Sequence, residues 1–146
     1  MKKMNNKGFS LVELIVVVLI MAIIAVALAP QVMKWVENSR KSTDIENYNA
    51  LIEAANIVTT NEKVLSTFPA AGITISMTNA TTGNSTTSTG GSAFDTLMED
   101  ALPNWQKTRI TSGDWSASSP FTISITKTTN GVKVEKGSSF PTKDFE

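Results

Sequence analysis

Glu13 is the only charged residue in an apolar stretch that runs from Phe9 to Ala29. A lone carboxylate in a membrane-length apolar segment is costly and marks a functional contact with a partner group. The chain contains no histidine and no cysteine, which excludes the common zinc sites, thiol nucleophiles and imidazole bases. We therefore expect no metal site, no cofactor and no enzymatic activity, and we expect Glu13 to act by pairing with another group.

The stretch that carries Glu13 is long enough to cross a membrane. As a helix rising about 1.5 Å per residue, residues 9–29 span roughly 31 Å, close to the thickness of a bilayer core. Lys2, Lys3 and Lys7 precede the stretch, so the positive-inside rule places the N-terminal end in the cytoplasm and the remainder outside. The sequence therefore predicts a single membrane-spanning helix.

Two simpler interpretations of this stretch compete. Ala27-Leu28-Ala29 has the small-x-small pattern of a secretory cleavage site, but Pro30 would follow that cut and the apolar run exceeds the usual length of about 7–15 residues. A plain single-pass anchor would tolerate Glu13, because a central carboxylate costs about 2.5–3.5 kcal/mol and less near an end. An anchor has no need of that carboxylate, however.

The residues around Glu13 form a recognisable pattern. Lys7-Gly8-Phe9-Ser10-Leu11-Val12-Glu13 resembles the class III leader of the type IV pilin and pseudopilin family. The resemblance implies that a prepilin peptidase cuts after Gly8, a residue whose lack of a side chain lets catalytic groups approach the backbone. It also implies that the new amino group of Phe9 is methylated. Glu13 of a neighbouring copy, or of the same chain, would neutralise this cation during assembly, and the cost of an unpaired buried charge would select one axial register.

The resemblance also implies a fold and a domain organisation. The expected fold class is α+β, with a long kinked N-terminal α-helix packed on a small antiparallel β-sheet. Pro30 is the expected kink, because proline removes a backbone donor and clashes with the preceding turn. We expect a cleaved leader (1–8), a transmembrane and filament-core helix (9–30), an amphipathic continuation (31–62) and a β-rich globular head (63–146).

The same resemblance implies partners and a location. The chain would form a homo-oligomeric helical filament and would meet the prepilin peptidase, a pilus assembly ATPase and a membrane platform protein. It would reside in the cytoplasmic membrane before assembly and in an extracellular pilus afterwards. Three alternatives stay open: a minor pilin acting as a tip adhesin, a pseudopilin of a type II secretion system or a competence pilus, and an anchored surface protein that never polymerises.

Charge and cysteine content narrow these possibilities. The 13 basic and 13 acidic residues balance, and loss of the three leader lysines would leave a net charge of −3. Nucleic-acid binding driven by overall charge is therefore not expected. Without cysteine the extracytoplasmic part must be held together by packing alone. Many Gram-negative pilins close a C-terminal loop with a disulfide, so its absence favours a Gram-positive source.

Beyond Pro30 the sequence becomes amphipathic. The apolar stripe recurs at helical spacing and predicts a helix that packs on the protein's own sheet and ends near residues 59–62. Its members are Ile45, Tyr48, Leu51, Ile52, Ala55 and Val58. The charged residues Glu37, Arg40, Lys41, Asp44 and Glu46 are expected on the other faces.

Alternating patterns in the C-terminal part predict a strand and a hairpin. Residues 73–78 alternate apolar and polar side chains, and residues 121–134 do so on both sides of Asn130-Gly131, a strong hairpin signal. Residues 79–92 are rich in Thr, Ser, Asn and Gly, which predicts an exposed mobile loop.

The remaining C-terminal residues predict a short helix and aromatic anchors. Ser92 is expected to cap a helix over residues 93–102 that Pro103 ends. Four aromatic side chains are expected to pack against the sheet or the helix. They are Trp105, Trp115, Phe140 and Phe145.

Overall fold

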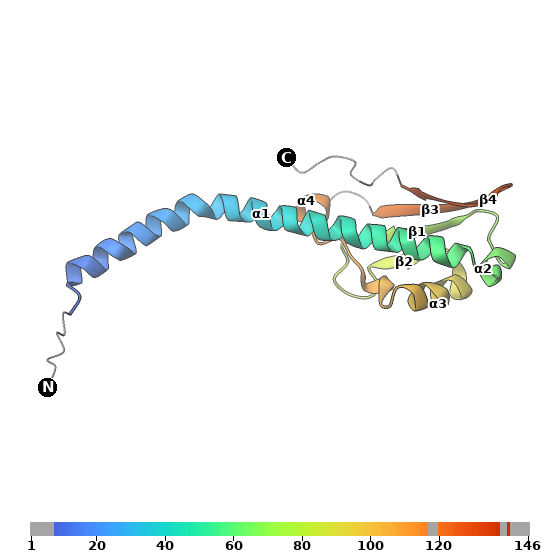
Figure 1. Ribbon diagram of the computed structural model, residues 1–146, viewed down its shortest axis with the longest axis horizontal. Helices are drawn as coiled ribbons and strands as arrows, with labels where there is room; N and C mark the ends of the chain where they lie inside the picture. Colours follow the sequence, from blue (N-terminus) through green and yellow to red (C-terminus); the bar gives the residue numbers. More distant parts are fainter. Residues whose placement is uncertain (1–7, 117–119, 138–139, 141–146) are drawn as a thin grey trace, which may run out of the picture. The chain divides into compact units, whose positions relative to one another are not determined.

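The structure is a computed structural model that describes residues 8–116, 120–137 and 140. It has the expected α+β architecture, with one long N-terminal helix and a small antiparallel sheet (Figure 1). The chain divides into two units, with the boundary between Val36 and Glu37. Helix α1 (Leu11–Thr59) contributes to both, and each unit is described by itself.

In the first unit, α1 is exposed along its whole length. Every described side chain from Gly8 to Val36 is exposed, and the helix continues on both sides of Pro30, which lies inside it. Apart from the donor that Pro30 lacks, a continuous helix pairs its own backbone groups, as the apolar interior of a membrane requires. The kink at Pro30 stays a prediction.

The second unit, which we call the head, contains a four-stranded antiparallel sheet with the strand order β2-β1-β3-β4. The strands are β1 (Ile73–Met77), β2 (Thr86–Ser88), β3 (Phe121–Thr128) and β4 (Gly131–Lys136). The predicted first strand and the predicted hairpin are confirmed. The two residues between the hairpin strands are Thr129 and Asn130, because Gly131 already pairs with Thr128, one position earlier than the Asn-Gly motif predicts.

The core of the head lies between the sheet and the distal half of α1, which lies along the sheet in Figure 1. Alternate side chains of β1 and β3 face the apolar stripe of the helix, including Ile75 and Ile123, which are paired in the ladder. Most of the predicted stripe is buried, namely Tyr48, Leu51, Ala55 and Val58. The helix ends at Thr59, within the predicted range of residues 59–62, because the apolar stripe that packs on the sheet ends there.

Tyr48 connects the helix to the C-terminal part of the sheet. Its hydroxyl donates to the carbonyl oxygen of Thr122 at 2.6 Å and accepts from the amide of Gly137 at 3.3 Å. Its ring stacks on Phe140 with 4.2 Å between centroids. The expectation for Phe140 is therefore confirmed, while Phe145 lies outside the described residues.

The prediction of a mobile loop over residues 79–92 is wrong for its second half. Strand β2 lies there, and Ser85 and Thr86 are buried. Their polar groups bond to the chain beyond α3: the Ser85 amide donates to the carbonyl of Gln106 at 2.8 Å, and the Thr86 hydroxyl to that of Thr108 at 2.5 Å. Polar residues bury without penalty when they are hydrogen-bonded in this way.

The helix predicted at residues 93–102 is present as α3 (Gly91–Ala101), but Ser92 does not cap it. Its N-cap is Gly90, and no side chain bonds to the exposed amides there. Ser92 lies within the first turn, where its carbonyl accepts the hydroxyl of Thr96. The apolar face of α3 buries Phe94 and Met98.

Three short elements complete the head. They are α2 (Glu62–Ser66), the 3-10 helix η1 (Trp105–Lys107) and α4 (Gly113–Ser116). Trp105 is buried and Trp115 is half-buried against the core, as expected of aromatic anchors.

Candidate functional site

The residues singled out in the sequence lie at the start of α1. Glu13 occupies the first turn, and its Oε2 accepts a hydrogen bond from the amide of Ser10 at 3.0 Å. The amide of Leu14 donates to the carbonyl oxygen of Ser10 at 3.2 Å. Ser10 therefore stands in the N-cap position and Glu13 three residues later, the arrangement in which the acidic side chain reaches back to the cap. The helix dipole also favours a negative charge in this turn.

This capping contact was missed in the sequence, although its signal is present. Ser10-Leu11-Val12-Glu13 follows the pattern of a Ser or Thr with an acidic residue three positions later, just before an apolar run. The contact gives Glu13 a local role in the uncut chain. The contact also keeps the Glu13 carboxylate on the amide of Ser10. Ser10 follows Phe9, so the carboxylate lies near the Gly8–Phe9 bond, where cleavage is expected.

Gly8 and Phe9 are both accessible. Phe9 is 88% exposed, and a Cβ built on Gly8 would meet no atom within 4 Å among residues 8–116, 120–137 and 140. The folded chain therefore does not itself require glycine at this position. A requirement for glycine would have to come from a partner that approaches the backbone.

The helix beyond this site presents an unusually apolar surface. Among the described residues, all exposed large apolar side chains except Ile57 lie between Phe9 and Val36. Within the described part of the chain, α1 is also the one helix long and apolar enough to cross a membrane. A helix that is apolar on every side needs lipid or other helices around it.

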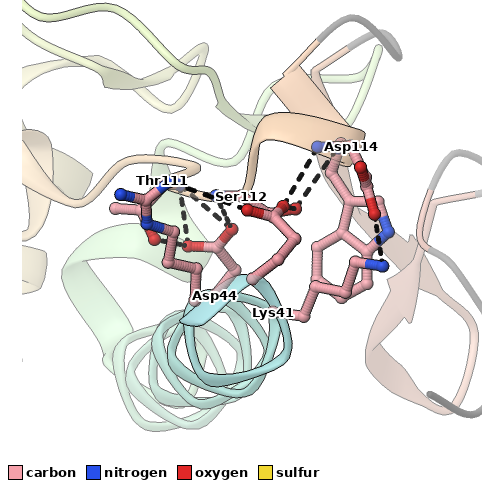
Figure 2. Close-up of polar contacts among 8 residues, drawn as sticks. Lys41, Asp44, Thr111, Ser112 and Asp114 are labelled. Carbon is pink, nitrogen blue, oxygen red and sulfur yellow. Dashed lines mark hydrogen bonds and ion pairs between the residues drawn. The ribbon is translucent and has the colours of Figure 1, made fainter. Parts of the chain in front are cut away.

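A second polar cluster lies in the head, where α1 meets the segment before β3. Asp44 is fully buried, and its carboxylate accepts two hydrogen bonds from the Thr111 amide, at 2.8 and 3.0 Å. It also accepts from the Thr111 hydroxyl at 2.7 Å and from the Ser112 amide at 2.8 Å (Figure 2). The prediction that Asp44 faces away from the core is therefore wrong. Helical periodicity could not reveal a contact between residues so far apart in the sequence.

Glu37 extends the cluster by two turns of α1. Its Oε1 accepts from the Ser112 hydroxyl at 2.5 Å and from the Asp114 amide at 3.1 Å. These bonds, the Ser112 hydroxyl first, hold the pKa of Glu37 below its ordinary value, and Arg40 adds a smaller effect in the same direction. Lys41 forms an ion pair with Asp114 at 2.6 Å. Within the described residues, no group of three acidic, histidine or cysteine side chains could hold a metal ion.

We expect Glu37 to make the stability of the head depend on pH. Its pKa in the folded state is lowered from an ordinary value of 4.5, so its stabilisation is complete above that pH and is lost as the pH falls through the lowered pKa. A Glu37→Gln variant should be less stable than the wild type by about 1 kcal/mol at neutral pH, and the difference should shrink in acid. Denaturant unfolding of the detergent-solubilised chain at several pH values measures this. A difference that stays constant from neutral to acid pH would contradict the expectation.

Comparison with known proteins agrees with the leader motif. Residues 3–29 match the family model for the prokaryotic N-terminal methylation motif. The search of curated proteins found no match, and neither did the search of solved structures.

The matched residues are the leader and the apolar start of α1, and there the chain is similar to type IV pilin-like and pseudopilin proteins. The prepilin leader motif implies processing by prepilin peptidase, and the apolar helix that follows it is long enough to anchor the chain in a membrane before assembly. Neither the match nor the fold supports the expectation of a Gram-positive source, which rested on the missing disulfide alone.

Proposed function

We propose that the chain is a structural subunit of an extracellular type IV pilus, one that forms the filament body. The observation that carries the proposal is the combination of a methylation-motif leader with an apolar helix whose side chains are exposed on every side. The small head has the compact size of a repeating subunit. The proposed parts are a leader (1–8), a filament-core helix (9–30), its amphipathic continuation (31–62) and a β-rich globular part (63–146).

In the proposed mechanism, cleavage after Gly8 exposes the amino group of Phe9, which is then methylated. Apolar helices of many copies leave the lipid and bundle together, so that apolar surface remains buried throughout. The Phe9 amino group and Glu13 neutralise each other and select the axial register of neighbouring subunits. Pro30 supplies a kink between the membrane-length part of the helix and its continuation.

The proposed partners follow from this mechanism. A prepilin peptidase acts on the leader, an assembly ATPase with a platform protein extracts subunits from the membrane, and other copies of the chain complete the filament. The exposed apolar surface from Phe9 to Val36 supports both the membrane state and the filament state.

Labelling the head with a specific antibody in filaments of the source organism tests the proposal. We expect label at regular intervals along the whole filament, because each repeat would contain this subunit. A strain lacking the chain, stained with the same antibody, is the control. Label restricted to filament ends would favour a tip adhesin, and cells with label in the membrane but no filaments would favour an anchored protein.

A further inference from the structure

The backbone of segment 111–115 is attached to α1 through two carboxylates, while Trp115 packs against the core. The amides of Thr111, Ser112 and Asp114 bond to the side chains of Asp44 and Glu37 and not to backbone carbonyls of the sheet. On its N-terminal side, the amide of Ile110 donates to the carbonyl of Thr78 at 2.8 Å. The order of segment 111–115 therefore depends on the charge state of two acidic residues on α1.

The charged form of both carboxylates suits these contacts. Hydrogen bonds to an ionised carboxylate are roughly twice as strong as bonds between neutral groups. Protonation of a carboxylate would weaken its hydrogen bonds, because it puts a hydrogen on an oxygen that otherwise only accepts. Within the described part of the chain no lysine or arginine forms an ion pair with Asp44, so hydrogen bonds alone compensate its buried charge.

Two basic side chains of α1 flank the cluster. Arg40 lies 3.7 Å from Glu37 on the same helix and favours its ionised form. Lys41 pairs with Asp114 of α4 at 2.6 Å and also lies over the ring of Trp115, 5.9 Å from its centroid.

The carboxylate contacts of the sheet lie outside its core: Glu135 of β4 pairs with Lys133 on the surface, and Ser88 of β2 donates to Asp95 of α3. Among the described residues, Asp44 is the only carboxylate in the buried set. The core between α1 and the strands consists of apolar side chains and Tyr48. Burial raises the pKa of Tyr48, which moves it further from neutral pH. Acid therefore acts on the attachment of the segment before it acts on the core.

We propose that Glu37 and Asp44 form a carboxylate latch that holds segment 111–115 on α1 at neutral pH, and that protonation of Glu37 in acid releases the segment while the sheet stays folded. Trp115 belongs to the released segment and packs edge-on against Phe121, with 5.7 Å between ring centroids. Opening separates these rings and exposes a new apolar surface on the head. In an extracellular subunit the external pH would operate the latch directly.

Hydrogen exchange of the full chain in detergent, followed by mass spectrometry and corrected for intrinsic rates, tests the latch. Because the pKa of Glu37 lies below its ordinary value of 4.5, the acidic sample is taken at about pH 2.5. Between pH 7 and this pH we expect peptides covering residues 111–115 to lose protection by about tenfold or more, and β1 and β3 to lose less than about twofold. Equal loss in the sheet, or a segment that stays protected in acid, would overturn the proposal.

Three variants separate the latch from general acid effects. Asp44→Asn keeps the shape of the side chain without its charge, and it should open the segment at pH 7. Glu37→Gln removes a partly exposed carboxylate, so it serves where Asp44→Asn fails to fold, and it should lower the protection of the segment at pH 7 and leave little further loss in acid. Glu46→Gln, on an exposed face of the same helix, should exchange like the wild type. A segment protected as in the wild type in both latch variants would refute the proposal.

Discussion

A Glu13→Gln variant is expected to insert into the membrane normally and to form no filaments. Glutamine can still accept the hydrogen bond that the Ser10 amide donates to Glu13 at 3.0 Å. The start of the helix is therefore preserved, and only the charge is lost. The Phe9 amino group would then be buried in the filament without a counter-charge. Removing one partner of a buried ion pair costs roughly 3–5 kcal/mol, which reduces the association constant by more than about a hundredfold.

Membrane fractionation and electron microscopy of sheared filaments measure the two outcomes separately. Glu13→Ala removes both the charge and the capping contact and should likewise give no filaments. Comparison of the two variants therefore separates register selection from helix capping. Normal filaments from Glu13→Gln would refute the charge-pairing argument, while filaments lost only in Glu13→Ala would assign the effect to the cap.

A Gly8→Val variant is expected to accumulate as uncut precursor in the membrane. A β-branched side chain would hinder the close approach of a peptidase to the backbone. A Cβ at this position meets no atom of the described residues within 4 Å, so the fold of that part of the chain should not change. We expect nearly complete loss of cleavage and therefore of filaments, because the amino group that pairs with Glu13 is never formed.

Intact-protein mass spectrometry reads this result directly. The wild type should give a chain that begins at a methylated Phe9, and Gly8→Val should give a chain that retains residues 1–8. Asn5→Ala, in the same leader but away from the expected cut, should be processed like the wild type. Cleaved Gly8→Val protein, or a wild type that retains Met1, would contradict the processing proposal.

Local patterns in the sequence predicted most of the secondary structure of the head. Strict alternation identified β1 and the β3–β4 hairpin, and helical spacing identified the buried stripe of α1 from Tyr48 to Val58. These predictions succeed because burial of one face imposes a period of two on a strand and about 3.6 on a helix. The leader motif was readable for a similar reason, since its residues are neighbours in the chain.

The errors share a different cause. Ser85 and Thr86 are polar and lie in a segment of loop-like composition, yet they are buried because carbonyl groups of residues 106 and 108 accept their hydrogen bonds. Asp44 looked like a solvated residue until its partners Thr111 and Ser112 were placed beside it. A polar side chain carries no local sign of a partner that lies tens of residues away.

The lone carboxylate of Glu13 was visible in the sequence by itself, together with the membrane-length helix, the leader and the alternating strands. Each of these depends on residue types at fixed short spacing. Only the tertiary structure decided that Asp44 and Glu37 hold segment 111–115, because hydrogen bonds between distant segments exist only after the sheet has brought them together.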